Sequence, residues 1–410
     1  MDLRSGISLW PAQNGKIYSY EPLKENITCD ILIVGGGIMG ALLAYQLSEN
    51  NENGLTIALV EKDEIAKGST SASTALLIYE LDVGLNKLIE LVGAEKAVRA
   101  YKVSLSSVKE IKNIIEKIGV DCCYQEKKTI YLSGSGEDVE DLRKEYQTLK
   151  KNDFKVDYVE AKELKEKYNI DREAGIIYHE GAEVDPYKLT HELIKKSQKN
   201  GVKIYEHTDI AEREVGDRNT CEKGILTTSG FIIKTCDLVF ATGYESQNYL
   251  GQNLVDLKSS YVIASNPLPD LSSHWLRDYL VWETSRPYLY VRTTPDNRII
   301  VGGEDEEVVD PKARDALLSK KTKTLTEKYG SLIKDLPISV DYAWTGTFGE
   351  TKDGLGYVGV PKDYKNIYFT LGFGGNGITF GVIAANILVD IILGRGVENH
   401  DLFSFDRLEN

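Results

Sequence analysis

Short apolar runs separated by glycines and polar residues mark the first part of the 410-residue chain. The run 31–34 passes through a glycine-rich stretch into the apolar segment 41–47, and a second apolar run follows at 55–60. Apolar runs of four to eight residues are typical of buried strands, and apolar positions on one face are typical of a helix. The opening of the chain therefore predicts a strand, a tight turn, a helix and a second strand, in the order of a βαβ unit.

Beyond this unit the pattern is no longer a simple alternation of strands and helices. Periodicity predicts helices over about 86–118, 137–151, 161–168, 187–199, 311–329 and 378–393, the fourth of them capped by Asp185 and Pro186. Strands are predicted over 128–133, 202–206, 236–243, 279–283, 287–293, 298–302, 339–347 and 366–371, with a hairpin of 225–228 and 231–233. The aromatic-rich strands from residue 279 onward predict an antiparallel sheet backed by helices, interleaved in sequence with the βαβ unit.

Composition limits the function and location of the protein. The chain carries 49 Lys and Arg against 63 Asp and Glu, and this net charge of −14 argues against a nucleic-acid partner. Five cysteines without C-x-x-C spacing and five scattered histidines predict reduced thiols and no metal site. The first residues lack a signal-peptide pattern, and the apolar stretches 31–47 and 378–393 are short or interrupted. We therefore expect a cytoplasmic protein without membrane insertion.

Three glycines after the first predicted strand have the spacing of a dinucleotide-binding turn. Gly35 permits a sharp turn, Gly37 lets the backbone approach a pyrophosphate, and Gly40 lets the helix pack on its strand. Ile38 and Met39 then lie in the first turn of the helix, whose positive end faces the phosphates.

An acid follows at the distance that this motif requires. Glu61 ends the second predicted strand 21 residues after Gly40, where a ribose-binding carboxylate is expected. The alternative is a glycine turn in an ordinary β-α unit, with Glu61 at a solvated strand end. The combination of strand, glycines and acid favours a dinucleotide site.

A second glycine turn occurs near the C-terminus. The predicted strand 366–371 leads into the glycine-rich segment 372–377 and then into the apolar helix 378–393. The N-terminus of that helix could face an electron-rich group, such as the N1–C2=O edge of a flavin that becomes anionic when reduced. The alternative is a tight turn before a core helix.

Together these segments resemble the FAD-dependent D-amino-acid oxidase superfamily, in the branch of sarcosine oxidases, glycine oxidases and γ-glutamylputrescine oxidoreductases. The matching pieces occur in family order: the glycine motif with Glu61, the hydroxyl-rich loop 68–75, Asp185 with Pro186, the segment 241–243, the segment from Trp344 to 354, and the segment 372–379. The resemblance covers nearly the whole chain. It implies an α/β fold, with a Rossmann-type FAD-binding domain (1–84, 155–257 and 345–410) interleaved with an α+β substrate domain (85–154 and 258–344).

The resemblance also implies cofactor-binding residues. Glu61 would hold the adenosine ribose, the hydroxyl loop would run along the pyrophosphate toward the flavin, and Ile210 would contact adenine through its backbone. The late glycine turn would cap the pyrimidine edge of the flavin. The complete set is Gly35, Gly37, Ile38, Met39, Gly40, Glu61, Lys62, Ser69, Thr70, Ser71, Ser73, Thr74, Ala75, Ile210, Ala241, Thr242, Gly243, Gly374, Gly375, Asn376, Gly377, Ile378 and Thr379.

Departures from the family pattern are equally informative. The segment 348–351 lacks the cysteine through which some members attach FAD, so we expect non-covalent FAD. Phe348 and Thr379 stand where relatives place an arginine or a lysine for a substrate carboxylate. Ile300 stands where sarcosine oxidases place a lysine that assists the reaction with oxygen, and Arg298 lies two residues earlier on the same strand face. The electron acceptor is thus oxygen or another compound, and a dehydrogenase is as credible as an oxidase.

Three side chains on one predicted strand are candidates for the catalytic, substrate-facing wall. Tyr288, Tyr290 and Arg292 alternate onto one face. The tyrosine rings could box an amine, and Arg292 could hold a carboxylate through two hydrogen bonds. The alternative is an ordinary aromatic sheet in which Arg292 pairs with a surface acid.

The sequence thus predicts an FAD-dependent oxidoreductase that oxidises an amine or an amino or imino acid at the carbon next to nitrogen, by hydride transfer to flavin N5. An NAD-linked dehydrogenase is an alternative, but it leaves the hydroxyl loop and the late glycine turn unexplained. A flavin-carrying electron-transfer subunit or partner-dependent module is another.

Overall fold

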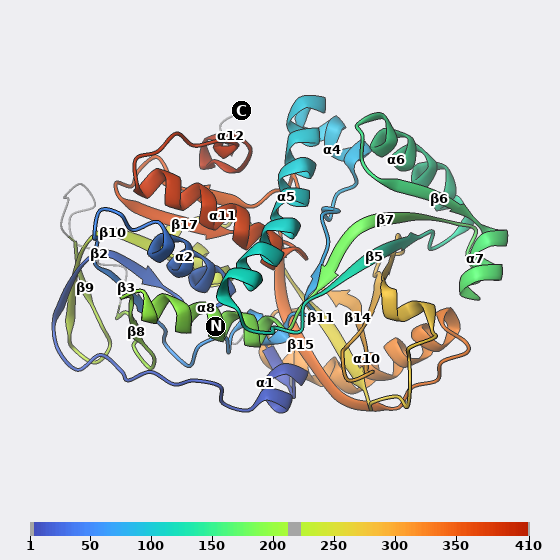
Figure 1. Ribbon diagram of the computed structural model, residues 1–410, viewed down its shortest axis with the longest axis horizontal. Coiled ribbons are helices and arrows are strands. Elements are labelled where there is room, and N and C mark those ends of the chain that lie inside the picture. Colours follow the sequence, from blue (N-terminus) through green and yellow to red (C-terminus); the bar gives the residue numbers. More distant parts are fainter. Residues whose placement is uncertain (1–3, 212–222, 409–410) are drawn as a thin grey trace.

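A computed structural model describes residues 4–211 and 223–408 of the chain. Two sheets organise these residues, the smaller on the left and the larger on the right of Figure 1. The mixed α/β architecture agrees with the expected fold class. Among the cysteines, Cys221 lies outside the described residues, whereas Cys29, Cys122 and Cys123 are free thiols.

The smaller sheet contains the predicted βαβ unit. Its strands follow the order β16 (Tyr357–Gly359), β17 (Ile367–Leu371), β10 (Ile232–Phe240), β2 (Ile27–Val34), β3 (Ile57–Val60) and β8 (Lys203–Tyr205), and β9 (Lys223–Leu226) pairs with β10. The five strands from β17 to β8 run parallel, and β10 lies between β17 and β2, both far from it in sequence. Parallel strands place their carboxyl ends at one edge, which is where ligands bind in such sheets.

Three helices lie beside this sheet, and α2 (Ile38–Glu49) packs against both α8 (Pro186–Lys199) and α11 (Gly377–Ile392). Most side chains of α2 and α11 are buried because both helices are apolar on nearly all sides. Asp185 caps α8 as predicted, and its Oδ1 accepts hydrogen bonds from the backbone N–H groups of Tyr187 (3.0 Å) and Lys188 (2.9 Å).

Within the described residues the larger sheet has ten strands. Their order is β1 (Arg4–Gly6), β15 (Val340–Glu350), β11 (Asp256–Ser265), β14 (Ile299–Glu306), β13 (Leu289–Thr293), β12 (Tyr279–Glu283), β5 (Gln125–Leu132), β7 (Ala174–Glu183) and β4 (Leu76–Leu77), with β6 (Val156–Glu160) on β7. All neighbours pair antiparallel except β12 and β5, which are parallel.

The remaining helices surround the two sheets. They are α1 (Leu9–Asn14), α3 (Ser69–Ala72), α4 (Leu85–Val92), α5 (Ala94–Ile118), α6 (Val139–Lys151), α7 (Ala161–Tyr168), α9 (Ser246–Leu250), α10 (Pro311–Leu332) and α12 (His400–Phe403), with short 3-10 turns at Gly136–Asp138, Gly243–Glu245, Trp275–Asp278 and Phe405–Leu408. The single helix predicted over 86–118 is two helices, because Gly93 interrupts it with a φ of +87°.

Strand pairing differs from the domain boundaries expected from the sequence. The strands β6 and β7, within 155–257, and β1 and β4, within 1–84, belong to the larger sheet rather than to the parallel sheet. The strand β15 also continues beyond residue 345 without a break. The physical reason is long-range backbone pairing: β7 hydrogen-bonds along most of its length with β5, and local apolar patterns do not encode that partner.

Candidate active site

A cavity of about 690 Å³ is lined by residues of both sheets. One end contains the first glycine turn, the start of α2 and the hydroxyl loop. The other contains aromatic side chains from β12 and β13. Most of the predicted cofactor-binding residues line this cavity, namely Gly35, Gly37, Ile38, Met39, Glu61, Lys62, Ser69, Thr70, Ser73, Thr74, Ala75, Ala241, Thr242, Gly243, Gly374, Gly375, Asn376, Gly377 and Ile378.

The first glycine turn is fixed by close backbone contacts. Gly35 has a φ of +112°, and a Cβ there would lie 2.4 Å from the carbonyl oxygen of Ala241. A Cβ on Gly40 would lie 1.9 Å from the carbonyl oxygen of Gly35. Both positions therefore require glycine: Gly35 for its left-handed conformation, and Gly40 for the packing of α2 on the turn.

The N-terminus of α2 opens onto the cavity. Gly37, at the N-cap, supplies no side-chain cap, and the N–H of Ile38 donates to the hydroxyl of Thr70 at 2.9 Å. The positive end of the helix and this hydroxyl therefore lie beside each other. Such an arrangement suits an anionic group such as a pyrophosphate.

Glu61 is held at the edge of this turn. Its Oε2 accepts from the N–H of Gly36 at 2.7 Å, and its Oε1 accepts from the N–H of Asp63 at 2.9 Å. Burial raises the pKa of Glu61, whereas these two backbone donors lower it. Beside it, Lys62 forms an ion pair with Glu245 at 2.8 Å. The carboxylate is thus oriented by the chain and faces the cavity, as a ribose ligand requires.

Some side chains of the hydroxyl-rich loop 68–75 lie at the cavity, and others point into the protein interior. The Oγ of Ser69 is buried at the cavity and has no hydrogen-bond partner among the described residues. The Oγ of Ser73 accepts from the N–H of Ala75 at 3.1 Å. Ser71 instead donates to the carbonyl of Gly68 at 3.0 Å and is fully buried, so its predicted cofactor contact is not seen.

Two other predicted cofactor residues also pack inside the protein. The side chain of Ile210 is buried in an apolar cluster, and its neighbours Thr208 and Asp209 line the cavity; the contact of its backbone with adenine stays a prediction. Thr379 is buried, and its hydroxyl donates to the carbonyl of Asn376 at 2.9 Å within the first turn of α11. Each lies one position after a lining residue, Asp209 or Ile378, so spacing along the sequence predicted the segment but not the individual lining residue.

Two acids that the sequence analysis missed hold the late glycine turn. The N–H of Gly375 donates to Oδ2 of Asp82 at 2.8 Å, and the side-chain amide of Asn376 donates to the carbonyl of Glu80 at 3.0 Å. Both acids line the cavity. A Cβ on Gly374 would lie 1.9 Å from Oδ2 of Asp82, so glycine allows this contact. The only sequence signal is that the apolar stretch 76–81 contains one acid and a second follows it.

The carboxyl group of Glu80 is buried, and one of its two oxygens lacks a hydrogen-bond partner among the described residues. It is 1 % exposed, and its Oε1 has no hydrogen-bond partner within the described parts of the chain. Burial raises the pKa of Glu80 to about 7, against the lowering effect of nearby backbone N–H groups. This carboxyl therefore gains or loses its proton near neutral pH.

Aromatic side chains form the far end of the cavity. The ring centroids of Tyr288 and Tyr290 lie 6.0 Å apart, and the hydroxyl of Tyr290 lies 3.1 Å from that of Ser260. Trp282 and Phe348 also line this end. The predicted tyrosine wall therefore faces the cavity.

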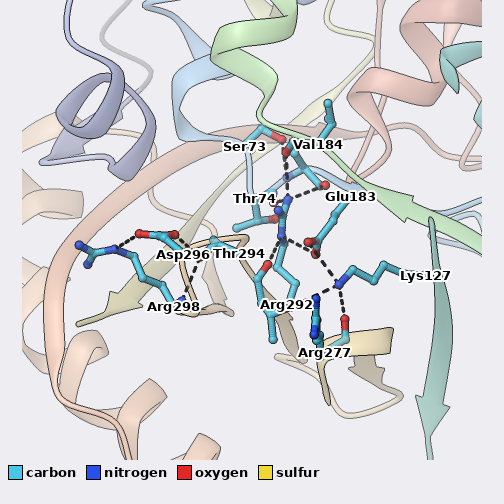
Figure 2. Close-up of polar contacts among 12 residues, drawn as sticks. Ser73, Thr74, Lys127, Glu183, Val184, Arg277, Arg292, Thr294, Asp296 and Arg298 are labelled. Atoms are coloured by element: carbon cyan, nitrogen blue, oxygen red, sulfur yellow. Dashed lines mark hydrogen bonds and ion pairs between the residues drawn. The ribbon is translucent and has the colours of Figure 1, made fainter. Parts of the chain in front are cut away.

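Arg292 does not belong to that wall, and its expected role in carboxylate binding is corrected. Its side chain is fully buried, and Nη1 donates to the carbonyls of Thr74 (2.9 Å), Ala75 (2.9 Å) and Val184 (3.1 Å). Figure 2 shows these contacts together with the ion pair to Glu183 at 3.3 Å. The alternation along β13 is as expected, but the hydroxyl loop covers this end of the strand.

A second buried cation completes the cluster around Arg292. Lys127 lies 3.3 Å from Glu183 and donates to the carbonyl of Arg277 (Figure 2). Burial lowers the pKa of Lys127, while Glu183 raises it. Two cations thus share one buried carboxylate, and this cluster joins β5, β7 and β13 behind the hydroxyl loop.

Ile300, at the position of the oxygen-assisting lysine of sarcosine oxidases, and Arg298, two residues earlier, also point away from the cavity. Ile300 is fully buried in the core. Arg298 binds Asp341 at 2.6 Å and Asp296 at 2.8 Å, the latter visible in Figure 2. Neither residue is part of the cavity lining within the described chain.

The N-termini of two helices, α2 and α11, each preceded by a glycine turn, line this one cavity. This suits a dinucleotide whose ring system becomes anionic on reduction, the cofactor chemistry of a flavin-dependent oxidoreductase. Residues 30–391 match the family model described as DAO, FAD dependent oxidoreductase. The match spans most of the chain, and the protein belongs to this family.

Individual relatives are distant but similar over most of their length. The chain is 22% identical to γ-glutamylputrescine oxidoreductase of Escherichia coli, over 97% of this chain and 91% of the relative. It is 23% identical to a putative Rieske 2Fe-2S iron-sulfur protein of Bacillus subtilis, over 91% of this chain and 70% of the relative. The crystal structure of glycine oxidase from Geobacillus kaustophilus superposes with a TM-score of 0.75 at 19% identity, covering 91% and 96% of the two chains.

FAD is the cofactor of this family, and the cavity fits it. The unpartnered Ser69 hydroxyl and the open N-terminus of α2 supply donors for phosphates, and Glu61 supplies an acceptor for a ribose hydroxyl. No cysteine lines the cavity within the described residues. Separately, none of the described helices combines the length and apolar character needed to cross a bilayer.

Proposed function

We propose that this protein oxidises an amine, or an amino or imino acid, at the carbon next to nitrogen. An amine that binds as the ammonium ion would first release a proton to solvent. The neutral amine would then lose a hydride from that carbon while its nitrogen lone pair forms the C=N bond of an iminium ion, which water hydrolyses. Bound FAD supplies the hydride acceptor at N5. Two of the three relatives cited above, γ-glutamylputrescine oxidoreductase and glycine oxidase, are named for the oxidation of such compounds, which supports this class of reaction.

The observation that carries the proposal is the continuity of the cavity. Its cofactor end and its aromatic end form one space, so a small molecule beside Tyr288 and Tyr290 would adjoin a bound flavin. Aromatic faces attract a cationic amine and exclude water from the reacting carbon. Hydride transfer needs orientation more than a strong base, and the tyrosine wall can provide orientation.

The decisive experiment is anaerobic mixing of the FAD-bound protein with a panel of amines and amino acids. We expect at least one compound to bleach the oxidised-flavin absorbance and to yield the corresponding aldehyde, ketone or oxo acid after hydrolysis. A protein that holds FAD but is bleached by no member of the panel contradicts the proposal. That outcome favours the electron-transfer or partner-dependent alternative.

The two tyrosines provide a sharper test of the wall. Tyr290→Phe removes only the hydroxyl that contacts Ser260, whereas Tyr290→Ala removes the ring. If the ring boxes the amine, the alanine variant should lose far more activity than the phenylalanine variant. Tyr279→Ala serves as a control, since this ring packs against Tyr168 rather than lining the cavity.

A further inference from the structure

A second cavity, of about 360 Å³, adjoins the first. The two share five lining residues, namely Asp82, Arg286, Tyr288, Gly372 and Gly374. Arg286 lies in the connection between β12 and β13, directly before the tyrosine wall, and is exposed. It is thus the cation placed where the two cavities meet.

The guanidinium of Arg286 is positioned but not neutralised. It lies over the ring of Tyr288, 4.6 Å from the centroid. In the described part of the chain, no hydrogen bond or ion pair within 4 Å joins it to a neighbour. Stacking on an aromatic ring fixes a guanidinium while leaving its N–H groups available in the plane.

The other basic residues that line the two cavities already have partners. Lys62 pairs with Glu245 at 2.8 Å, and Lys67 pairs with Glu64 at 2.6 Å, both beside the cofactor-binding loops. In the second cavity, Lys258 pairs with Glu350 at 2.7 Å. Arg4 donates to the carbonyl of Lys67, again beside those loops. An anion at the aromatic end therefore meets Arg286 first.

We propose that Arg286 binds the carboxylate of the substrate, and that the substrate class is an amino acid rather than a simple amine. This inference rests on the proposed function. It assigns to Arg286 the role that the sequence suggested for Arg292, whose side chain is fully buried and donates through Nε and Nη1 to carbonyls inside the protein. A planar guanidinium matches a carboxylate with two parallel N–H···O bonds.

The acidic residues around Arg286 restrict the charge that a ligand at this site can carry. Asp82 and Asp305 line the second cavity; burial raises the pKa of both carboxyls, whereas the nearby charge of Arg286 lowers it. The Oδ1 of Asp305 is buried and has no hydrogen-bond partner in the described structure. A ligand with only negative charge would be repelled by these acids. An amino acid carries both the anion for Arg286 and a positive group that the acids favour.

The test compares two substrates that differ only in the carboxylate: the best amino acid of the panel and the amine that remains when its carboxyl group is replaced by hydrogen. In Arg286→Met, the KM for the amino acid should rise roughly ten- to a hundredfold, the scale of one charge-assisted bidentate pair. The KM for the amine should stay within about twofold. The KM of Arg286→Lys for the amino acid should lie between those of wild type and Arg286→Met. An ammonium group keeps the positive charge but cannot form the two parallel hydrogen bonds of a guanidinium.

A matched control is Arg143→Met. Arg143 is also exposed and lies over a tyrosine ring, that of Tyr158, at 5.0 Å, but it lines neither cavity. This variant should change neither KM. FAD content and melting temperature, measured for every variant, separate a binding effect from misfolding.

The outcomes distinguish this inference from the proposed function. If amines bleach the flavin and amino acids do not, or if Arg286→Met changes both KM values alike, the inference is overturned while the proposed function stands. If no compound bleaches the flavin, calorimetric titration of the FAD-bound protein with glycine and methylamine still tests Arg286. Glycine binding that weakens tenfold or more only in Arg286→Met supports it. Wild-type protein that does not bind glycine, or variant protein that binds it equally well, overturns it.

Discussion

The guanidinium of Arg292 lies 2.9 Å from the carbonyl oxygen of Thr74, although 218 residues separate the two in the chain. This contact fastens a strand of the larger sheet to the loop that lines the cofactor end of the cavity. Arg292 therefore acts on the shape of the cavity and not on its contents.

Arg292→Met should lower stability and FAD content rather than substrate affinity. The substitution removes a buried cation from Glu183 and leaves backbone carbonyls without donors, which costs about 3–5 kcal/mol. Denaturant unfolding of the apoprotein measures this cost. Arg99→Met, which breaks an exposed pair with Asp401, should cost less than about 1 kcal/mol. A fully stable Arg292→Met with normal FAD content and a raised KM would return Arg292 to the substrate site.

Glu61→Ala should weaken FAD binding by roughly 1–3 kcal/mol, the scale of a hydrogen bond to a charged group. The variant also loses the acceptor for Gly36, so the turn itself loosens. Glu61→Gln keeps a hydrogen-bond acceptor but not the negative charge, so its FAD affinity should lie between those of wild type and Glu61→Ala. Titration of apoprotein with FAD gives the affinities, and an unchanged value for Glu61→Ala would remove this residue from the ribose site.

The purified protein should be yellow, and heat or acid should release its FAD into the supernatant. The reason is that no cysteine lines the cavity in the described residues. Absorbance and mass spectrometry of the supernatant and the precipitate check this. Colour that remains with the precipitated protein would show a covalent link.

Substrate-reduced protein should react faster with an artificial quinone than with dissolved oxygen. The apolar, buried Ile300 stands where sarcosine oxidases place the lysine that assists the reaction with oxygen. The lysines that line the large cavity lie beside the cofactor-binding loops. No lysine from these residues would then stabilise reduced oxygen, and the remaining cation at the aromatic end, Arg286, is assigned to the substrate carboxylate. Stopped-flow reoxidation decides the matter, and rapid oxygen consumption would identify an oxidase instead.

Glu80 should make stability depend on pH near neutrality. Its pKa is raised by burial from the ordinary 4.5 to about 7, so the folded chain holds this proton more tightly than the unfolded chain. The corresponding stability is complete below about pH 4.5 and is lost as the pH rises through about 7. Glu80→Gln mimics the protonated form. Its stability relative to wild type should therefore rise by about 3 kcal/mol between these limits, at about 1.36 kcal/mol per pKa unit. Parallel unfolding curves across this pH range would contradict the assignment.

The sequence by itself determined the parts of the site that have local causes. Gly35 is required by its own positive φ, the helix α8 starts where Asp185 caps it, and Glu61 ends a strand at a fixed spacing from the glycine turn. Each depends on interactions within a few residues or within one βαβ unit, so spacing along the chain was enough to predict it.

The tertiary structure decided which side chains reach the cavity. Alternation along β13 put Tyr290 and Arg292 on one face, but only the approach of the hydroxyl loop buried Arg292 and left the tyrosine exposed to the cavity. The pairing of β7 with β5, and the contact of Asp82 with Gly375, likewise join segments far apart in sequence. Burial and strand partners arise from the packing of the whole chain, and a local pattern carries no information about which distant segment will cover it.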